Sequence, residues 1–227
     1  MWYAGELLTS HRESFRKFHE LTERVIPDNM RHPEYEDATQ IDWLCTEALN
    51  RIGFGTPGEI QRFWDAMSTA EVKTWLHGSS KILAPVEVQA ADGAWSQAFA
   101  PADIEARIAK TLAPTSRLRI LNPFDPVIRD RTRLKRLFGF DYRVEMFIPA
   151  AKRQWAYYVY PILQGNRFVG RIEVRGDRAK GDLNVLAFWP EPGVKWSGTR
   201  RNKLAAELAR FARLAEVRNV NWLCAGP

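Results

Sequence analysis

The sequence predicts an α+β fold in which three helices and a β-hairpin precede a mainly antiparallel, β-barrel-like domain with a C-terminal helix. Three observations carry this prediction. Residues 34–99 hold three segments with helix-start signals and then two apolar segments joined by Asp92-Gly93. Residues 121–178 alternate short apolar segments with basic turns, and an apolar stripe at helical spacing follows Ser197.

We expect three parts in the chain: residues 1–33, 34–114 and 115–227. The first part should hold a strand at Glu6–His11 and one or two helical turns between Phe15 and Val25, where apolar residues recur at spacings of three and four. Nothing precedes this strand and helix for them to pack on. They are therefore interpreted as the remnant of a preceding module, in a fragment or in a chain that lacks upstream modules.

The second part should be a helical domain with a hairpin. The stripe in residues 33–53 has the helical period and stops at Gly53. Thr56-Pro57-Gly58-Glu59 is typical of a helix start, and Ser68 to Glu71 forms a capping box for the next helix.

Two strands, Ile82–Gln89 and Ala94–Phe99, should follow as a hairpin because Asp-Gly favours a tight turn. Three helices followed by a hairpin is the order of a winged helix. The third helix would be its recognition helix, yet AEVKTWLHG has one Lys and few groups that read bases, so we interpret this domain as a spacer or packing module.

The third part should be a basic sheet domain that begins after Pro114–Arg117. Strands are expected at residues 144–150 and within 154–163 and 168–178, with basic turns between them. Helices are expected at Pro101–Thr111, at Arg129–Phe138 and after Ser197 or Thr199, and a final strand at Val217–Leu223.

Charge divides the chain unevenly. The net charge is +6, but residues 1–100 hold 9 Lys and Arg against 15 Asp and Glu, and residues 101–227 hold 24 against 12. Clustered arginine in one domain favours phosphate and nucleic-acid binding. The alternative is a basic surface that serves only solvation.

Other features narrow the protein class. The sequence holds no apolar run long enough to span a bilayer, and its start lacks signal-peptide features, so we expect no membrane partner and a cytoplasmic location. We expect Cys45 and Cys224 to be reduced, buried thiols. No metal or cofactor is expected, because the sequence holds no phosphate-binding loop or nucleophile elbow and its histidines are scattered: His11, His19, His32 and His77.

Basic residues in and beside the turns are candidate phosphate contacts, and solvated turn charge is the alternative. The candidate DNA-binding residues are Arg129, Arg131, Lys135, Arg136, Lys152, Arg153, Arg171, Arg175 and Arg178.

Other side chains have two interpretations each. Trp155, Tyr157 and Tyr158 are suited to stacking on bases, but strand aromatics are more often core. Asp125 and Asp130 form either a catalytic carboxylate pair or caps for local turns, and the structural interpretation is favoured.

The third part resembles the C-terminal domain of the winged-helix crosslink-repair DNA glycosylases of the YcaQ/AlkZ type. The matching residues are Pro123 to Pro126, Asp130-Arg131, Leu137-Phe138, Phe140 to Arg143, Pro149, Ala151 to Arg153, Tyr157 to Val159, Pro161, Gly165, Arg167, Val169 to Arg171 and Asp177-Arg178. A weaker, collinear match covers residues 34–99 as the last winged helix of that family.

The resemblance implies three tandem winged helices and a β-barrel-like domain that bind double-stranded DNA, excise N7-alkylated purines and unhook interstrand crosslinks without a cofactor. Its catalytic pair is Gln-x-Gln or Gln-x-Asp in the first winged helix. This chain has Gln40-Ile41-Asp42, but at the start of the last winged helix, and Ile41 belongs to an apolar stripe. We interpret the match as coincidence and leave the catalytic residues unassigned, with the missing winged helices supplied by upstream domains or a partner.

Three hypotheses stay open. The chain is a crosslink-repair glycosylase or its C-terminal half, a non-catalytic winged-helix DNA-binding module, or an interaction domain whose arginines are only solvated.

Overall fold

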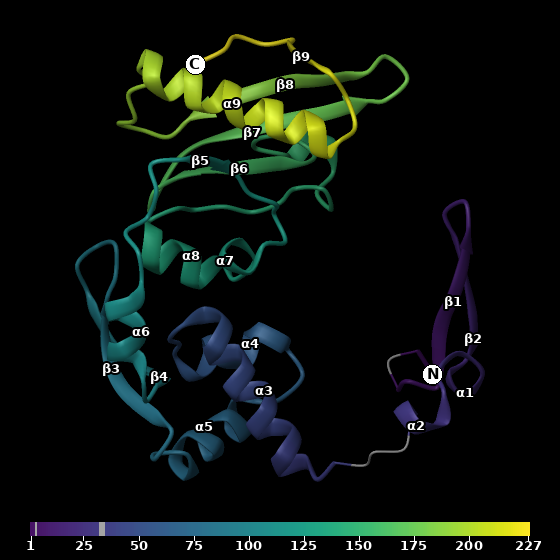
Figure 1. Cartoon of the computed structure of the whole chain (residues 1–227), viewed down its shortest axis with the longest axis vertical. Coiled ribbons are helices and arrows are strands. Elements are labelled where there is room, and N and C mark those ends of the chain that lie inside the picture. The colour runs from purple at the N-terminus through teal and green to yellow at the C-terminus, as the bar shows by residue number, and fades with distance from the viewer. Residues whose placement is uncertain (3, 32–34) are drawn as a thin grey trace. The chain divides into compact units, whose positions relative to one another are not determined.

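The computed structural model describes residues 1–2, 4–31 and 35–227, which divide into two compact units, Met1–Trp43 and Leu44–Pro227 (Figure 1). Helices and strands occur in both units, which confirms the predicted α+β class. The boundary predicted between residues 33 and 34, the predicted start of a helix at residue 33 and His32 lie outside the described residues.

The first unit is built on an antiparallel hairpin of β1 (Leu7–Glu13) and β2 (Arg16–Leu21), which confirms a strand near Glu6–His11. Two short helices follow, α1 (Thr22–Val25) and α2 (Asp28–Arg31).

The helix predicted from Phe15 onward is wrong as far as Leu21. The backbone turns at Ser14, which has φ of 55°, and returns as a strand. Phe18 stacks on His11 across the hairpin with ring centroids 4.7 Å apart, while Phe15 is 95% exposed at the turn. Cross-strand pairing therefore decides this segment, because a lone helical turn has no face to bury here.

Helix α3 (Asp37–Ile52) runs from the first unit into the second and stops before Gly53, whose φ of 78° suits glycine. The predicted N-cap at Thr56 and the predicted capping box at Ser68 are confirmed, and Thr56 also forms a capping box with Glu59. Thr56 caps α4 (Pro57–Trp64), and Ser68 caps α5 (Thr69–Gly78). The predicted hairpin is also confirmed, as β3 (Leu83–Gln89) paired with β4 (Trp95–Pro101).

A five-stranded sheet forms the rest of the second unit, in the order β5-β6-β7-β8-β9. Its pairs are antiparallel except β8 with β9, which confirms a mainly antiparallel sheet. The order is open, with β5 and β9 at the edges, so a barrel-like closure stays a prediction. The strands are β5 (Leu118–Ile120), β6 (Val159–Gln164), β7 (Arg167–Asp177), β8 (Asp182–Pro190) and β9 (Asn219–Trp222).

Helix α9 (Gly198–Leu214), capped by Ser197, one of the two predicted caps, lies across one face of the sheet (Figure 1). Its Leu204 and Leu208 are buried in one core cluster with Ile162 and Ile172 of the sheet. Gly170 of β7 allows close packing, since a Cβ there would lie 2.9 Å from the Trp189 carbonyl oxygen.

A second core cluster joins two short helices to Phe168 of β7. The helices are α7 (Pro126–Arg129) and α8 (Arg131–Phe138), where one helix was predicted from Arg129. Asp125 caps α7 by accepting from the Val127 N–H at 2.9 Å, and Asp130 caps α8 by accepting from the Arg133 N–H at 3.0 Å. Capping confirms the structural interpretation of these two carboxylates.

The strand predicted at residues 144–150 is wrong. These residues form a loop that ends in the short helix η1 (Ala150–Lys152). The buried Glu145 carboxylate accepts hydrogen bonds from the Gln154 and Trp155 N–H groups at 3.0 and 2.7 Å. The apolar run imitates a strand, but the Ile148 N–H donates to the Glu145 carbonyl oxygen at 2.9 Å, which closes a turn instead of pairing with a neighbouring strand.

The predicted boundary at Pro114–Arg117 lies between α6 (Ile104–Lys110) and β5, in a segment without helix or strand. Both sides of it belong to the second unit. Glu59 of α4 joins them, because its side chain, which is 3% exposed, pairs with Arg133 at 2.9 Å and with Arg136 at 2.6 Å, both from α8. Burial lowers the pKa of Arg133, and Glu59 opposes that shift.

Within the described residues, no helix is long and apolar enough to cross a membrane.

Candidate functional site

Two adjoining hollows form the main candidate site, named here the cationic groove. The first has a volume of about 750 Å³ and lies between the β3–β4 turn and α8. The second has a volume of about 510 Å³ and lies beside the loop that follows Asp141. Asp141 lines both hollows, so they adjoin each other in the second unit.

Hydrogen bonds hold the wall of the first hollow in place. The Ala91 N–H in the hairpin turn donates to the Arg136 carbonyl oxygen at 2.8 Å. The Arg136 side chain then donates to Ser96 Oγ at 3.0 Å and to Glu59. Arg136 is therefore held by the protein itself, and its predicted role in DNA binding would be indirect.

The other two cations of α8 at the first hollow, Arg131 and Lys135, are more exposed than Arg136. Arg131 is exposed and forms no ion pair with the described residues. Lys135 pairs with Asp141 at 2.9 Å, but both side chains are more than 60% exposed, so solvent screens the pair. Both cations are available to an anion in the groove.

Lys152 and Arg143 line the second hollow, and both are exposed without an ion pair to the described residues. Arg143 was not among the predicted DNA-binding residues, although its place in the FGFDYR motif offered a signal. The fold places Arg143 beside Lys152 because Glu145 ties the loop back at Gln154.

Arg171 is the buried cation of the second hollow, with 5% exposure. Its Nε donates to Glu191 at 2.8 Å and its Nη2 donates to the Asp141 carbonyl oxygen at 2.8 Å. Its guanidinium lies 4.4 Å from the Phe140 ring centroid and 4.7 Å from the Trp155 ring centroid. Arg171 is therefore a structural cation first, and DNA contact by it stays a prediction.

Four of the predicted cations lie outside the lining of the groove. Arg129 lies 4.8 Å from the Phe63 ring centroid, and Arg153 donates to the Ile148 carbonyl oxygen at 2.9 Å. Arg175 and Arg178 lie near the β7–β8 turn, where Arg178 donates to the Ala215 carbonyl oxygen at 3.3 Å. The structure does not bring these four into one site.

The candidate stacking residues differ in their exposure. Tyr157 is 45% exposed and lies under the Arg153 guanidinium at 5.1 Å. Tyr158 is half-buried, which raises its pKa, and its hydroxyl lies 3.4 Å from Asn122 Oδ1. Trp155 lines the second hollow, while Trp95, which was not predicted, is 63% exposed in the first.

The candidate catalytic residues, Gln40 and Asp42, lie in the part of α3 that belongs to the first unit. Gln40 is exposed, and its Nε2 donates to the Tyr35 carbonyl oxygen at 2.8 Å. Asp42 is also exposed. Their role in catalysis stays untested.

The part of the chain that the structure describes contains no cluster of side chains suited to binding a metal ion. No group of three His, Cys, Asp or Glu side chains converges there. The two cysteines are not joined to each other: Cys45 is buried beside Met67, and Cys224 is only half-buried, which corrects its predicted burial. Burial raises the pKa of the Cys224 thiol.

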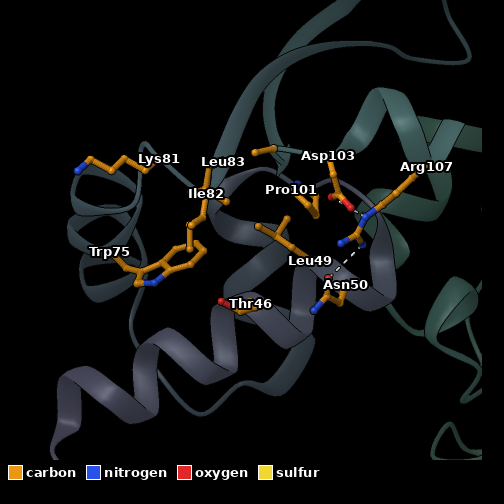
Figure 2. Close-up of a pocket in the computed structure, with 11 residues that line it drawn as sticks. Thr46, Leu49, Asn50, Trp75, Lys81, Ile82, Leu83, Pro101, Asp103 and Arg107 are labelled. Carbon is orange, nitrogen blue, oxygen red and sulfur yellow. Dashed lines mark hydrogen bonds and ion pairs between the residues drawn. The ribbon is translucent and has the colours of Figure 1, made fainter. Parts of the chain in front are cut away.

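Another hollow, of about 440 Å³, lies beside Leu49, Trp75 and Ile82 (Figure 2). Its walls are largely apolar, and Arg107 is bonded to Asp103 at 2.7 Å and to Asn50 at 3.0 Å. This hollow therefore offers a polyanion fewer available cations than the cationic groove.

Comparisons with known proteins agree with one another. A model of the "DNA glycosylase AlkZ-like" family matches residues 1–214. The structure is similar to Streptomyces sahachiroi DNA glycosylase AlkZ, with a TM-score of 0.65 and 17% sequence identity. That match covers 96% of this chain and 55% of the Streptomyces chain, so this chain spans about half the length of that protein.

Proposed function

This chain belongs to the AlkZ-like DNA glycosylase family, and from that membership we propose that it binds duplex DNA in the cationic groove as part of DNA repair. The observation that carries the proposal is the line of exposed cations along the groove. Arg131 and Lys135 line the first of two adjoining hollows, and Arg143 and Lys152 line the second. Phosphates are the anions that such spaced, solvated cations select on a duplex.

The order of helices and strands in residues 34–114 favours a structural role for this domain over the reading of bases. Helices α3, α4 and α5 and the β3–β4 hairpin follow the order of a winged helix, and we propose this architecture for residues 34–114, with a barrel-like domain in 115–227. Helix α5 carries few side chains that read bases. In this proposal the helical domain forms a groove wall, and phosphate contacts position the DNA.

Glycosylase activity on N7-alkylated purines and crosslink unhooking are part of the proposal for the whole protein. The buried carboxylate of the groove is already engaged, because Glu145 accepts two backbone N–H groups, whereas Asp141 is exposed and its pair with Lys135 is screened by solvent. We therefore propose that the groove holds DNA and that the catalytic winged helix of the family lies outside these residues. The cytoplasmic location predicted from the sequence is kept as part of this proposal.

A non-catalytic DNA-binding module is the second candidate function. The observation that favours it is the coverage of 55% of the Streptomyces chain, which leaves nearly half of that protein unmatched.

One experiment separates these functions. The chain is incubated with labelled duplex that carries N7-methylguanine, and the sample is divided between a native gel and heating in alkali, which cleaves abasic sites. A shift without cleavage is expected, and it supports a DNA-holding role for these residues. A shift with cleavage places the active site within this chain, with Gln40 and Asp42 as candidates. No shift at low salt contradicts both DNA-binding functions and favours an interaction domain.

Salt dependence tests the groove itself. If the four exposed cations each contact one phosphate, log K should fall with log salt at a slope of about −3.6. A slope near zero would contradict phosphate contact.

A further inference from the structure

The second hollow of the cationic groove contains more than phosphate-binding groups. Trp155 supplies an aromatic ring, Gln154 an amide, and Arg143 and Lys152 exposed cations. Its volume of about 510 Å³ falls within the roughly 300–1,000 Å³ of small-molecule sites. A single phosphate contacted by one lysine would leave most of this space and chemistry unused.

Several donors at this hollow have no protein acceptor. Three Arg171 contacts use its Nε and Nη2, and its Nη1 makes no hydrogen bond with the described residues although the side chain is 95% buried. The Trp155 indole N–H and the Gln154 side-chain amide likewise make no hydrogen bond to that part of the chain. Trp196 Nε1 is the buried side-chain atom without a partner in the described part of the chain, so the donors of this hollow are in contact with solvent, which a ligand can replace.

The site is also held rigid. Glu145 accepts from the backbone of Gln154 and Trp155, and Trp155 packs edge-to-face on Trp189 with ring centroids 5.4 Å apart. A rigid aromatic platform loses little conformational entropy when a flat ligand stacks on it.

The mixture of groups favours a base over an anion alone. Glu191 already neutralises Arg171, so the buried guanidinium offers hydrogen-bond direction more than net charge. Gln154 presents both a donor and an acceptor, as the edge of a nucleobase requires. Arg143 and Lys152 supply the charge that the attached phosphate requires.

We propose that the second hollow receives one extrahelical nucleotide of the bound DNA, with the base at Trp155 and Gln154 and its phosphate at Arg143 and Lys152. This inference rests on the proposed DNA binding and adds a preference for DNA with an unpaired nucleotide. Moving a nucleotide out of the duplex costs least where it is already unpaired.

The test measures the affinity of the full chain for three labelled duplexes by fluorescence anisotropy. One duplex is fully paired, the second carries a single adenine bulge, and the third carries an abasic bulge that keeps the phosphate and the bend but lacks the base. We expect the adenine bulge to bind about 10-fold more tightly than either of the others, within the range that base stacking on an aromatic side chain gives.

Two variants test whether the preference for the adenine bulge depends on the second hollow. Gln154→Ala removes an exposed amide whose backbone bond to Glu145 remains, and Trp155→Phe keeps a ring but loses the indole N–H. Each should reduce the preference for the adenine bulge at least threefold. Asn166→Ala, on the exposed β6–β7 turn, is the matched control and should leave all three affinities unchanged.

Each other outcome overturns the inference. Equal affinity for the adenine and abasic bulges, with salt-dependent duplex binding intact, excludes the base while the proposed function stands. A bulge preference that survives both variants places the base elsewhere. No binding to any of the three duplexes removes the proposed function as well.

Discussion

Replacing Glu59 by Gln should destabilise the second unit, because it removes the charge of a buried carboxylate that pairs with two arginines. Glu59 is 3% exposed at its side chain, and its two partners, Arg133 and Arg136, are 12% and 18% exposed. The substitution preserves side-chain size and removes the charge. It leaves two guanidinium groups close together without their shared counter-ion, and Asp130 remains as a weaker electrostatic partner of Arg133.

The magnitude follows from the burial of this network. Removing one partner of a buried ion pair costs about 3–5 kcal/mol. Gln at the third helical position still fits a capping box, and its carbonyl oxygen still accepts from one arginine, so we expect about 3 kcal/mol. For a chain of this size that loss corresponds to a melting temperature lower by roughly 6–12 °C.

Glu71 provides the matched control, because it holds the same position in the capping box of α5. Its carboxylate accepts from the Ser68 N–H at 2.7 Å, and hydrogen bonding to Ser68 lowers its pKa. It forms no ion pair with the described residues. Glu71→Gln should therefore cost much less than Glu59→Gln.

Urea denaturation and thermal melting followed by circular dichroism would measure both variants. Equal, small losses of unfolding free energy for the two substitutions would refute the argument, because they would show that the charge of Glu59 contributes only to its cap. A large loss of unfolding free energy in Glu59→Gln alone would support the conclusion that the ion pairs of Glu59 hold α4 against α8.

Three further predictions follow from the groove, from α3 and from the sheet. Replacing Arg143 and Lys152 together by Ala should reduce the salt slope of duplex binding by about 2 in gel-shift titrations; Arg213→Ala, on the exposed face of α9, should leave it unchanged, and equal effects would remove the pair from the site. Gln40→Ala should change the unfolding free energy by less than about 0.5 kcal/mol, because the side chain is exposed, and only the alkali-cleavage assay should respond if this residue is catalytic; destabilisation with unchanged cleavage would mark it as structural. Burial raises the pKa of Tyr160, so the stability that its neutral hydroxyl contributes is present below pH of about 10 and is lost as pH rises through the folded pKa; unfolding free energy should fall in alkali, and less steeply in Tyr160→Phe, whereas parallel curves would contradict the assignment.

Local signals predicted much of the framework correctly. The N-cap at Thr56, the capping box at Ser68 and the Asp92-Gly93 turn appear as expected, and Ser197 is the one of two expected caps that the last helix uses. Each depends on residues within a few positions of one another, so short-range hydrogen bonding and backbone conformation decide them.

Apolar spacing was misleading where the partner is distant in sequence or is a side chain. Phe18 stands in a helical series but pairs across a hairpin with His11. Residues 144–150 are mostly apolar like a strand, yet the Ile148 N–H bonds within a turn, and the Glu145 side chain holds the loop at Gln154 and Trp155. Periodicity describes which residues are buried, and it does not identify the acceptor of each N–H group.

The charged residues show the same division between what the sequence predicts and what only the tertiary structure decides. The sequence by itself determined that residues 101–227 carry the cationic excess, and its motifs indicated the family. Only the tertiary structure decided which cations are available: Arg171 is buried on Glu191, Arg136 is held by Glu59, and Arg143 and Lys152 share a hollow. The physical reason is that a charge is a property of one residue, whereas its burial and its partners depend on segments far apart in the chain.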